Sequence, residues 1–233
     1  MKNYLIIGGS SGIGKEIVNI LMNTSSNNII ATYNENSKGD VENVSFFEFN
    51  SLKDDLDLAY LPEKIHGLVY CPGSINLKPF HRFSDQDFIK DFSLQVLGAA
   101  KVIRQILPKL KKAENASIVL FSTIAAQKGF NFHSLVSTSK GAIEGLTRSL
   151  AAEFAPTIRV NAVAPSLTNT TLASKFLNSY EKIKIHSEKN PLKKIGNASD
   201  IAEAATYLLT DKSSWVTGQI LHVDGGHSTI VQN

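Results

Sequence analysis

The sequence Tyr4-Leu5-Ile6-Ile7-Gly8-Gly9-Ser10-Ser11-Gly12-Ile13-Gly14 joins a short apolar run to a turn of glycine and serine. An amphipathic helix is predicted to begin at Gly12, with Ile13 and Ile17 on one face. Glycine removes side chains where a backbone comes close to a phosphate, and a helix N-terminus offers free N–H groups. The stretch therefore predicts a strand–turn–helix unit that binds an anion. Its spacing is G-x-x-x-G-x-G rather than G-x-G-x-x-G, so an ordinary tight turn is the alternative interpretation.

Short apolar runs alternate with segments of helical period along the chain, which is typical of a parallel α/β sheet. Seven runs are predicted as strands: Tyr4–Ile7, Asn28–Thr32, Val44–Phe49, Gly67–Cys71, Ser117–Phe121, Ile158–Ala162 and Gln219–Val223. Four helices are predicted: from Gly12, from Ser84 to Pro108, from about Val136 to Phe154, and from Ser199 as an N-cap. Residues 167–189 show no strand pattern and are interpreted as a mobile helical lid over a substrate pocket. We expect one doubly wound domain over residues 1–233, with helices on both faces of the sheet.

The composition excludes several classes of protein. The 24 Lys and Arg against 21 Asp and Glu give a net charge of +3, too small to predict binding to nucleic acid or to a membrane. Hydrophobic residues make up 42% of the chain and charged residues 19%, which predicts a large core and excludes general disorder. Cys71 is the only cysteine, so no intrachain disulfide can form. The histidines are isolated, so no metal site is predicted. No signal peptide or transmembrane run is evident, and we therefore expect a soluble, cytoplasmic protein.

Further motifs follow the glycine turn in a fixed order: Ile158–Pro165, Asn190–Leu192, Ser199–Ala202 and Thr217–Gly226. Together with the turn they resemble the short-chain dehydrogenase/reductase family over nearly the whole chain. The resemblance implies a single Rossmann-type domain that binds a nicotinamide cofactor and a small-molecule substrate. It also implies a homotetramer or homodimer. The cofactor-binding residues that it implies are Gly8, Ser10, Ser11, Gly12, Ile13, Gly14, Asn50, Ser51, Gly73, Lys140, Pro165, Leu167 and Thr170.

The residues after the second predicted strand bear on the choice of cofactor. An NAD site usually places a carboxylate there to bind the ribose 2′-hydroxyl. This chain has Thr32 and Asn34 instead, which could bond a 2′-phosphate, while Lys15 or Lys38 could supply positive charge. We therefore predict NADP(H) rather than NAD(H). Glu35 follows directly, and an ordinary polar turn is the alternative interpretation.

The catalytic positions that the resemblance implies are largely replaced. Lys140 matches the lysine of the family's Y-x-x-x-K motif, but Val136 stands where the motif has its tyrosine. In the family this tyrosine donates a proton to the substrate oxygen, and valine has none to give. Thr123 falls at the position of the substrate-orienting serine with Ser122 beside it, and Gln95 falls at the asparagine position.

Three hypotheses follow. In the first, the protein is an NADP(H)-dependent oxidoreductase of a small carbonyl or alcohol, and His133 replaces the tyrosine as proton donor. A helix that included His133 would place it on one face with Val136 and Lys140, and an imidazole titrates near ~6.5; Tyr70 is a weaker candidate. In the second, the protein binds NADP(H) without chemistry, as a sensor or regulatory subunit. In the third, it is a structural oligomer with a vestigial pocket.

Overall fold

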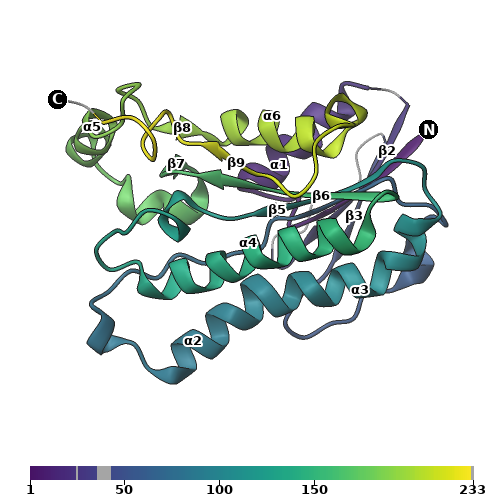
Figure 1. Ribbon diagram of the computed structural model, residues 1–233, viewed down its shortest axis with the longest axis horizontal. Coiled ribbons are helices and arrows are strands. Elements are labelled where there is room, and N and C mark those ends of the chain that lie inside the picture. The colour runs from purple at the N-terminus through teal and green to yellow at the C-terminus, as the bar shows by residue number, and fades with distance from the viewer. Residues whose placement is uncertain (25, 36–42, 232–233) are drawn as a thin grey trace.

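Seven parallel strands form one sheet in the order β3-β2-β1-β4-β5-β6-β9 (Figure 1). The computed structural model describes residues 1–24, 26–35 and 43–231. The strands are β1 Lys2–Ile7, β2 Asn27–Tyr33, β3 Val44–Glu48, β4 Gly67–Tyr70, β5 Ala116–Phe121, β6 Ile158–Pro165 and β9 Ile220–Val223. All seven predicted strands are confirmed, with small differences at their ends. Two further strands, β7 Thr168–Asn169 and β8 Gly196–Asn197, form a separate pair that the sequence did not predict.

The helices form a layer on each face of this sheet. Figure 1 shows α1 (Gly12–Met22) and α6 (Ala198–Leu209) on one face, and α2 (Asp85–Phe92), α3 (Gly98–Lys111) and α4 (Ser134–Phe154) on the other. Each layer closes its own hydrophobic core against the strands. The predicted doubly wound architecture is therefore confirmed. Strands β2 and β3 lie on one side of β1, and β4 and the strands after it lie on the other. The strand order therefore reverses at β1, and sheets of this kind bind ligands at such a point.

The predicted helix from Ser84 to Pro108 is two helices joined by a wider turn. Ser84 caps α2 in a capping box with Asp87. Residues Ser93–Leu97 then form a π-helical turn before α3 begins. Helix α3 continues past Pro108, where the predicted apolar stripe ends, to Lys111 and buries Leu110 against the sheet.

Two predicted helix starts also differ from the structure. The N-cap of α6 is Asn197 rather than Ser199, because the Asp200 carboxylate accepts a hydrogen bond from the Asn197 N–H at 2.7 Å. Helix α4 begins at Ser134, with His133 as its N-cap. Within residues 167–189 the expected helices are a 3-10 helix at Thr171–Phe176 and α5 at Tyr180–Glu188, but the range also contains strand β7, which was not expected there.

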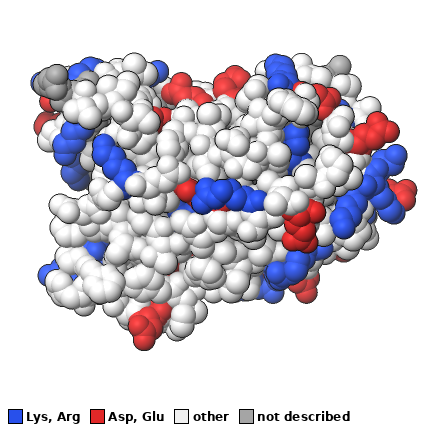
Figure 2. All heavy atoms as spheres, viewed as in Figure 1, with Lys and Arg blue, Asp and Glu red and all other residues white. Residues whose placement is uncertain are grey.

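The surface carries no large area of one charge on the face shown in Figure 2, where basic and acidic side chains are interspersed. Within the described part of the chain, no helix is both long enough and apolar enough to cross a membrane.

Backbone conformation and close packing both favour glycine in the turn. Gly8 and Gly12 have φ angles of +78° and +52°, which favour glycine, and a Cβ atom placed on Gly14 would lie 2.3 Å from the Gly8 carbonyl oxygen. The N–H of Gly8 donates to the hydroxyl of Thr32 at 2.9 Å. Thr32 is 1% exposed, so this bond joins the ends of β1 and β2 inside the protein.

We predict that Thr32→Val destabilises the turn. Valine has nearly the same volume but no oxygen, so the Gly8 N–H loses its acceptor, at a cost of about 1–3 kcal/mol in the free energy of unfolding. Urea denaturation measures this cost, and hydrogen exchange of the Gly8 amide should become faster. Thr32→Ser keeps the oxygen and should protect that amide as the wild type does. Equal exchange rates in the valine and serine variants would contradict this role for Thr32.

Candidate active site

A cavity of about 690 Å³ opens at the carboxyl ends of β1, β4, β5 and β6. At one end it is lined by the glycine turn, from Gly8 to Gly14. Its other end is walled by the side chains of Phe130, Leu172 and Phe176. The last two belong to the predicted lid, so the lid borders the cavity as expected. Lys140 lines the same cavity.

Most of the predicted cofactor-binding residues meet at this cavity. Those that line it are Gly8, Ser10, Ser11, Gly12, Ile13, Gly14, Asn34, Gly73, Lys140, Pro165, Leu167 and Thr170. The missing Cβ atoms and the free N-terminus of α1 leave backbone N–H groups open to an anion. A long ligand with phosphates near α1 and a reactive end near Lys140 therefore fits the residues present.

Three predicted cofactor contacts are not at the cavity wall. Thr32 is buried, and its hydroxyl holds the Gly8 N–H instead of facing a ribose phosphate. The Asn50 amide oxygen accepts a hydrogen bond from the Leu52 N–H at 3.0 Å, within its own turn. The Ser51 hydroxyl accepts from the Tyr70 hydroxyl at 3.0 Å in the core. Each of these side chains makes a hydrogen bond within the protein.

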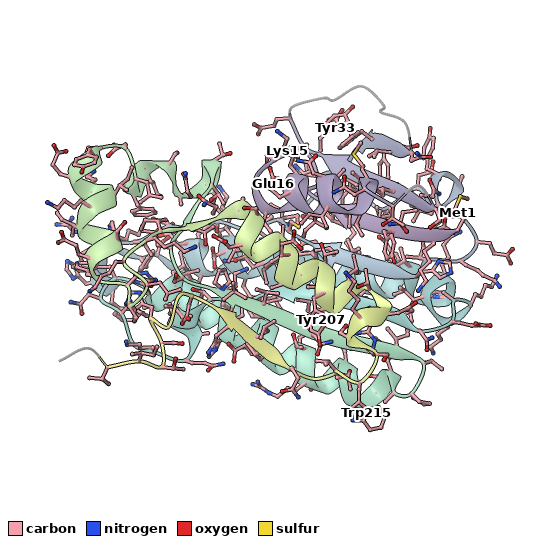
Figure 3. All side chains as sticks on the ribbon, turned by 90° about the horizontal axis from the view of Figure 1, so that it is seen from above. Met1, Lys15, Glu16, Tyr33, Tyr207 and Trp215 are labelled. Atoms are coloured by element: carbon pink, nitrogen blue, oxygen red, sulfur yellow. The ribbon has the colours of Figure 1, made fainter. Side chains whose placement is uncertain are left out.

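A second, polar hollow of about 420 Å³ shares the start of α1 with the cavity. Ser10, Ser11 and Lys15 line it on one side and Thr170 on the other, with the carboxylate of Glu16 also at its wall. Figure 3 shows Lys15 and Glu16 on α1, on the side of the molecule where β2 ends at Tyr33. Lys15 thus brings positive charge to the predicted phosphate site, whereas Lys38 lies outside the described residues.

Val136 and Lys140 lie one turn apart on α4, and both line the cavity. Val136 is 6% exposed and offers no proton. The Lys140 ammonium donates to the Phe121 carbonyl oxygen at 2.8 Å. Burial lowers the pKa of Lys140 to about 8, although the negative charge of Asp91 acts in the opposite direction. An amine with this pKa exchanges protons readily near neutral pH.

The two hydroxyl groups at the serine position have different surroundings. The Thr123 hydroxyl lies at the cavity wall and donates to the Pro165 carbonyl oxygen at 3.4 Å. The Ser122 hydroxyl donates to the buried carboxylate of Glu144 at 2.8 Å. Both residues line the cavity, and Thr123 makes the longer and weaker of the two hydroxyl bonds, so its hydroxyl is the more readily available to a substrate.

The candidate replacements for tyrosine are also separated by the structure. His133 lines the cavity, but it precedes the first residue of α4, so the expected common helical face with Val136 and Lys140 is absent. Its Nδ1 lies 2.7 Å from the Asn131 carbonyl oxygen, and its ring packs against Phe130. Tyr70 is not available as an acid, because its hydroxyl is bonded in the core and burial raises its pKa to about 12.

Sequence reasoning missed Asp91, a buried carboxylate on α2 that is 5% exposed. It accepts hydrogen bonds from Ser74, Gln95 and Ser139. The signal was present, since Asp91 lies three residues after Phe88 and four before Gln95, on the face of the helix that carries the apolar stripe. An acid on that face predicts a buried, partnered carboxylate.

The substrate end of the cavity carries two more histidines. His186 from α5 and His227 from the C-terminal segment line it together with His133, and burial lowers the pKa values of His186 and His227. Among the described residues, no Asp or Glu lines this cavity. Over the same part of the chain, no three His, Cys, Asp or Glu side chains are grouped so that they could hold a metal ion.

Comparisons with known proteins agree with this architecture. Residues 48–228 match the family model described as enoyl-(acyl carrier protein) reductase. A tropinone reductase homolog of Arabidopsis thaliana is 31% identical over 241 residues, which cover 95% of this chain and 78% of that protein.

Solved structures are similar over almost the whole chain. A short-chain dehydrogenase family protein from Francisella tularensis has a TM-score of 0.89 and 28% identity, covering 99% of this chain and 100% of that one. A Tyr-to-Phe variant of ElxO with NADPH bound has a TM-score of 0.87 and 28% identity, covering 97% and 98% of the two chains. The chain therefore belongs to the short-chain dehydrogenase/reductase family, whose members are nicotinamide-dependent oxidoreductases.

Proposed function

We propose that this protein is an NADP(H)-dependent oxidoreductase that acts on a small carbonyl compound or the corresponding alcohol. The observation that carries the proposal is the single cavity that joins the glycine turn to the ammonium group of Lys140. A protein that only bound the nucleotide would keep both of these features, but it would not need an apolar wall for a substrate. The buried, hydrogen-bonded Lys140 beside an apolar substrate wall supports chemistry at the other end.

Several features support NADP(H) over NAD(H). The end of β2 carries Asn34 at the cavity wall and no acid between Thr32 and Asn34. Lys15 adds positive charge near the phosphate end, where an extra 2′-phosphate needs it. The NADPH-bound variant of ElxO is a structural relative over nearly the whole chain.

The residues of the cavity have separate tasks in this proposal. A bound nicotinamide supplies the hydride for carbonyl reduction, or accepts it when an alcohol is oxidised. Thr123 orients the substrate oxygen through its hydroxyl group, and the Lys140 ammonium supplies positive charge near that oxygen. Leu172 and Phe176 contact the apolar part of the substrate and exclude water. The substrate class that fits is a carbonyl compound with an apolar side.

One observation favours a second candidate function. Val136 leaves the tyrosine position without a hydroxyl, as expected of a protein that binds NADP(H) as a sensor or regulatory subunit. The two functions share the cofactor site and differ in turnover, so binding and activity must be measured separately.

The cofactor part of the proposal predicts that NADPH binds at least about 10-fold more tightly than NADH, because a 2′-phosphate gains a charged hydrogen bond. Calorimetry on the purified protein measures both affinities. Lys15→Met should reduce this preference while leaving NADH binding nearly unchanged. Equal affinities would contradict the choice of NADP(H), and binding of neither nucleotide would contradict the proposed function.

The catalytic part predicts that Val136→Tyr increases carbonyl reduction by about 100-fold, because it restores a proton donor one helical turn before Lys140. Val136→Phe is the matched control, since it adds the same ring without the hydroxyl. NADPH consumption with a panel of apolar ketones and aldehydes provides the measurement. If both variants change the rate equally, position 136 does not have the tyrosine's place in the site.

A further inference from the structure

Asp91 is the centre of a buried hydrogen-bond cluster beside the cavity. It accepts from Gln95 Nε2 at 2.8 Å, from Ser139 Oγ at 2.6 Å and from Ser74 Oγ. These donors come from the π-helical turn after α2, from α4, and from the loop after β4. A buried carboxylate is stable only when hydrogen bonds replace its hydration, and here three donors do so.

The bond to Asp91 fixes which way the Gln95 amide faces. If the amide were rotated by half a turn, its oxygen would lie against the carboxylate, where two acceptors repel each other. The amide oxygen therefore points away from Asp91 and lines the cavity. Gln95 is 1% exposed, and among the described residues its Oε1 has no hydrogen-bond partner. A buried acceptor of this kind requires a donor.

Gly73 leaves space between this acceptor and Lys140. A Cβ atom placed on Gly73 would lie 3.5 Å from Gln95 Oε1 and 3.8 Å from Lys140 Nζ. One N–H of the ammonium already donates to the Phe121 carbonyl oxygen, and two others remain. A water molecule in this space can accept from Lys140 and donate to Gln95. Its second hydrogen is then free for a substrate oxygen.

We propose that Asp91 is a positioning residue for a proton donor made of Lys140 and one water molecule, with Gln95 Oε1 holding that water against the ammonium. This donor takes the place of the hydroxyl that Val136 lacks. The inference rests on the proposed function, since it concerns the proton of the same carbonyl reduction.

The proton passes from Lys140 through the water molecule to the substrate oxygen. Hydride addition to the carbonyl carbon leaves a negative charge on the substrate oxygen. An O–H bond of the water breaks as the product O–H bond forms, and an N–H bond of Lys140 breaks as the water regains its proton. The electron pair stays on the lysine nitrogen, which takes a proton from solvent afterwards. Each carbonyl consumes one reduced nicotinamide and one proton.

The charges around Lys140 suit this task. Asp91 faces it from α2 and favours the ammonium form, while burial favours the neutral amine. Cys71, after β4, faces it as a neutral thiol, because burial raises its pKa to about 12. The Lys140 ammonium also donates a hydrogen bond to the carbonyl oxygen of Phe121, at the end of β5. Asp91 therefore keeps a desolvated lysine protonated near neutral pH, which a general acid requires.

The test compares Asp91→Asn with Asp85→Asn, an exposed acid on the same helix. In protein labelled with ¹³C at lysine Cε, NMR follows the titration of Lys140, which Lys140→Met assigns. Because Asp91→Asn removes the charge that favours the ammonium, we expect the pKa of Lys140 to fall by about 1 or more in this variant and to stay unchanged in Asp85→Asn. The alkaline limit of kcat/KM for carbonyl reduction should move down with it.

Gln95→Met is the second variant, should Asp91→Asn fail to fold. It keeps roughly the shape of the side chain and leaves both serine bonds to Asp91, but it removes the acceptor Oε1 together with the Nε2–H bond to Asp91. We expect kcat to fall by more than about 10-fold while the Kd for NADPH changes by less than about threefold.

Two results would overturn the inference while leaving the proposed function intact. One is carbonyl turnover with an unchanged Lys140 pKa in folded Asp91→Asn. The other is a pH profile whose ionisation disappears in His133→Ala, which would assign the proton to the imidazole. NADPH binding without turnover of any carbonyl would instead contradict the proposed function, and with it the donor.

Discussion

Helix α1 approaches the end of β1 so closely that a side chain at Gly14 would contact the carbonyl oxygen of Gly8. This approach turns the N-terminus of α1 toward the carboxyl edge of the sheet, where the strand order reverses. Thr32 holds the turn from the side by accepting the Gly8 N–H. The anion-binding end of the cavity exists only because these backbone groups occupy space that side chains would fill.

The opposite end of the cavity depends on α4. This helix packs along the sheet and places Val136 and Lys140 on its cavity side, while Ser139 reaches Asp91 on α2. Thr123 and Gln95 line the same cavity as Val136 and Lys140. The buried carboxylate of Asp91 binds Gln95 and Ser139 beside them. This arrangement supports a site that still controls a proton.

Sequence reasoning succeeded where the information is local. The seven strands are continuous apolar runs, and the glycine turn, Lys140 and Val136 are defined by spacings within a single segment. Helix boundaries were less accurate, because Asn197 and the π-helical turn at Ser93–Leu97 depend on backbone hydrogen bonds that periodicity does not reveal.

Side-chain roles that depend on distant partners could not be predicted in the same way. Thr32 was assigned to a phosphate because nothing in its own segment indicates the Gly8 N–H as its partner. Ser122 was assigned to the substrate because its partner Glu144 lies in α4, and nothing in the segment around Ser122 indicates that contact. Asp91 meets its donors only after α2, α4 and the loop after β4 pack together. Such contacts are set by tertiary packing rather than by spacing.

The proposed function requires that a site with Val136 in the tyrosine position reduces a carbonyl. The most direct measurement incubates the wild-type protein with NADPH deuterated at C4 on either face, together with an apolar ketone, and analyses the product by mass spectrometry. We expect an alcohol that carries one deuterium at the former carbonyl carbon from one of the two labelled cofactors. Tight binding of both cofactors without any deuterated alcohol would contradict the proposed function.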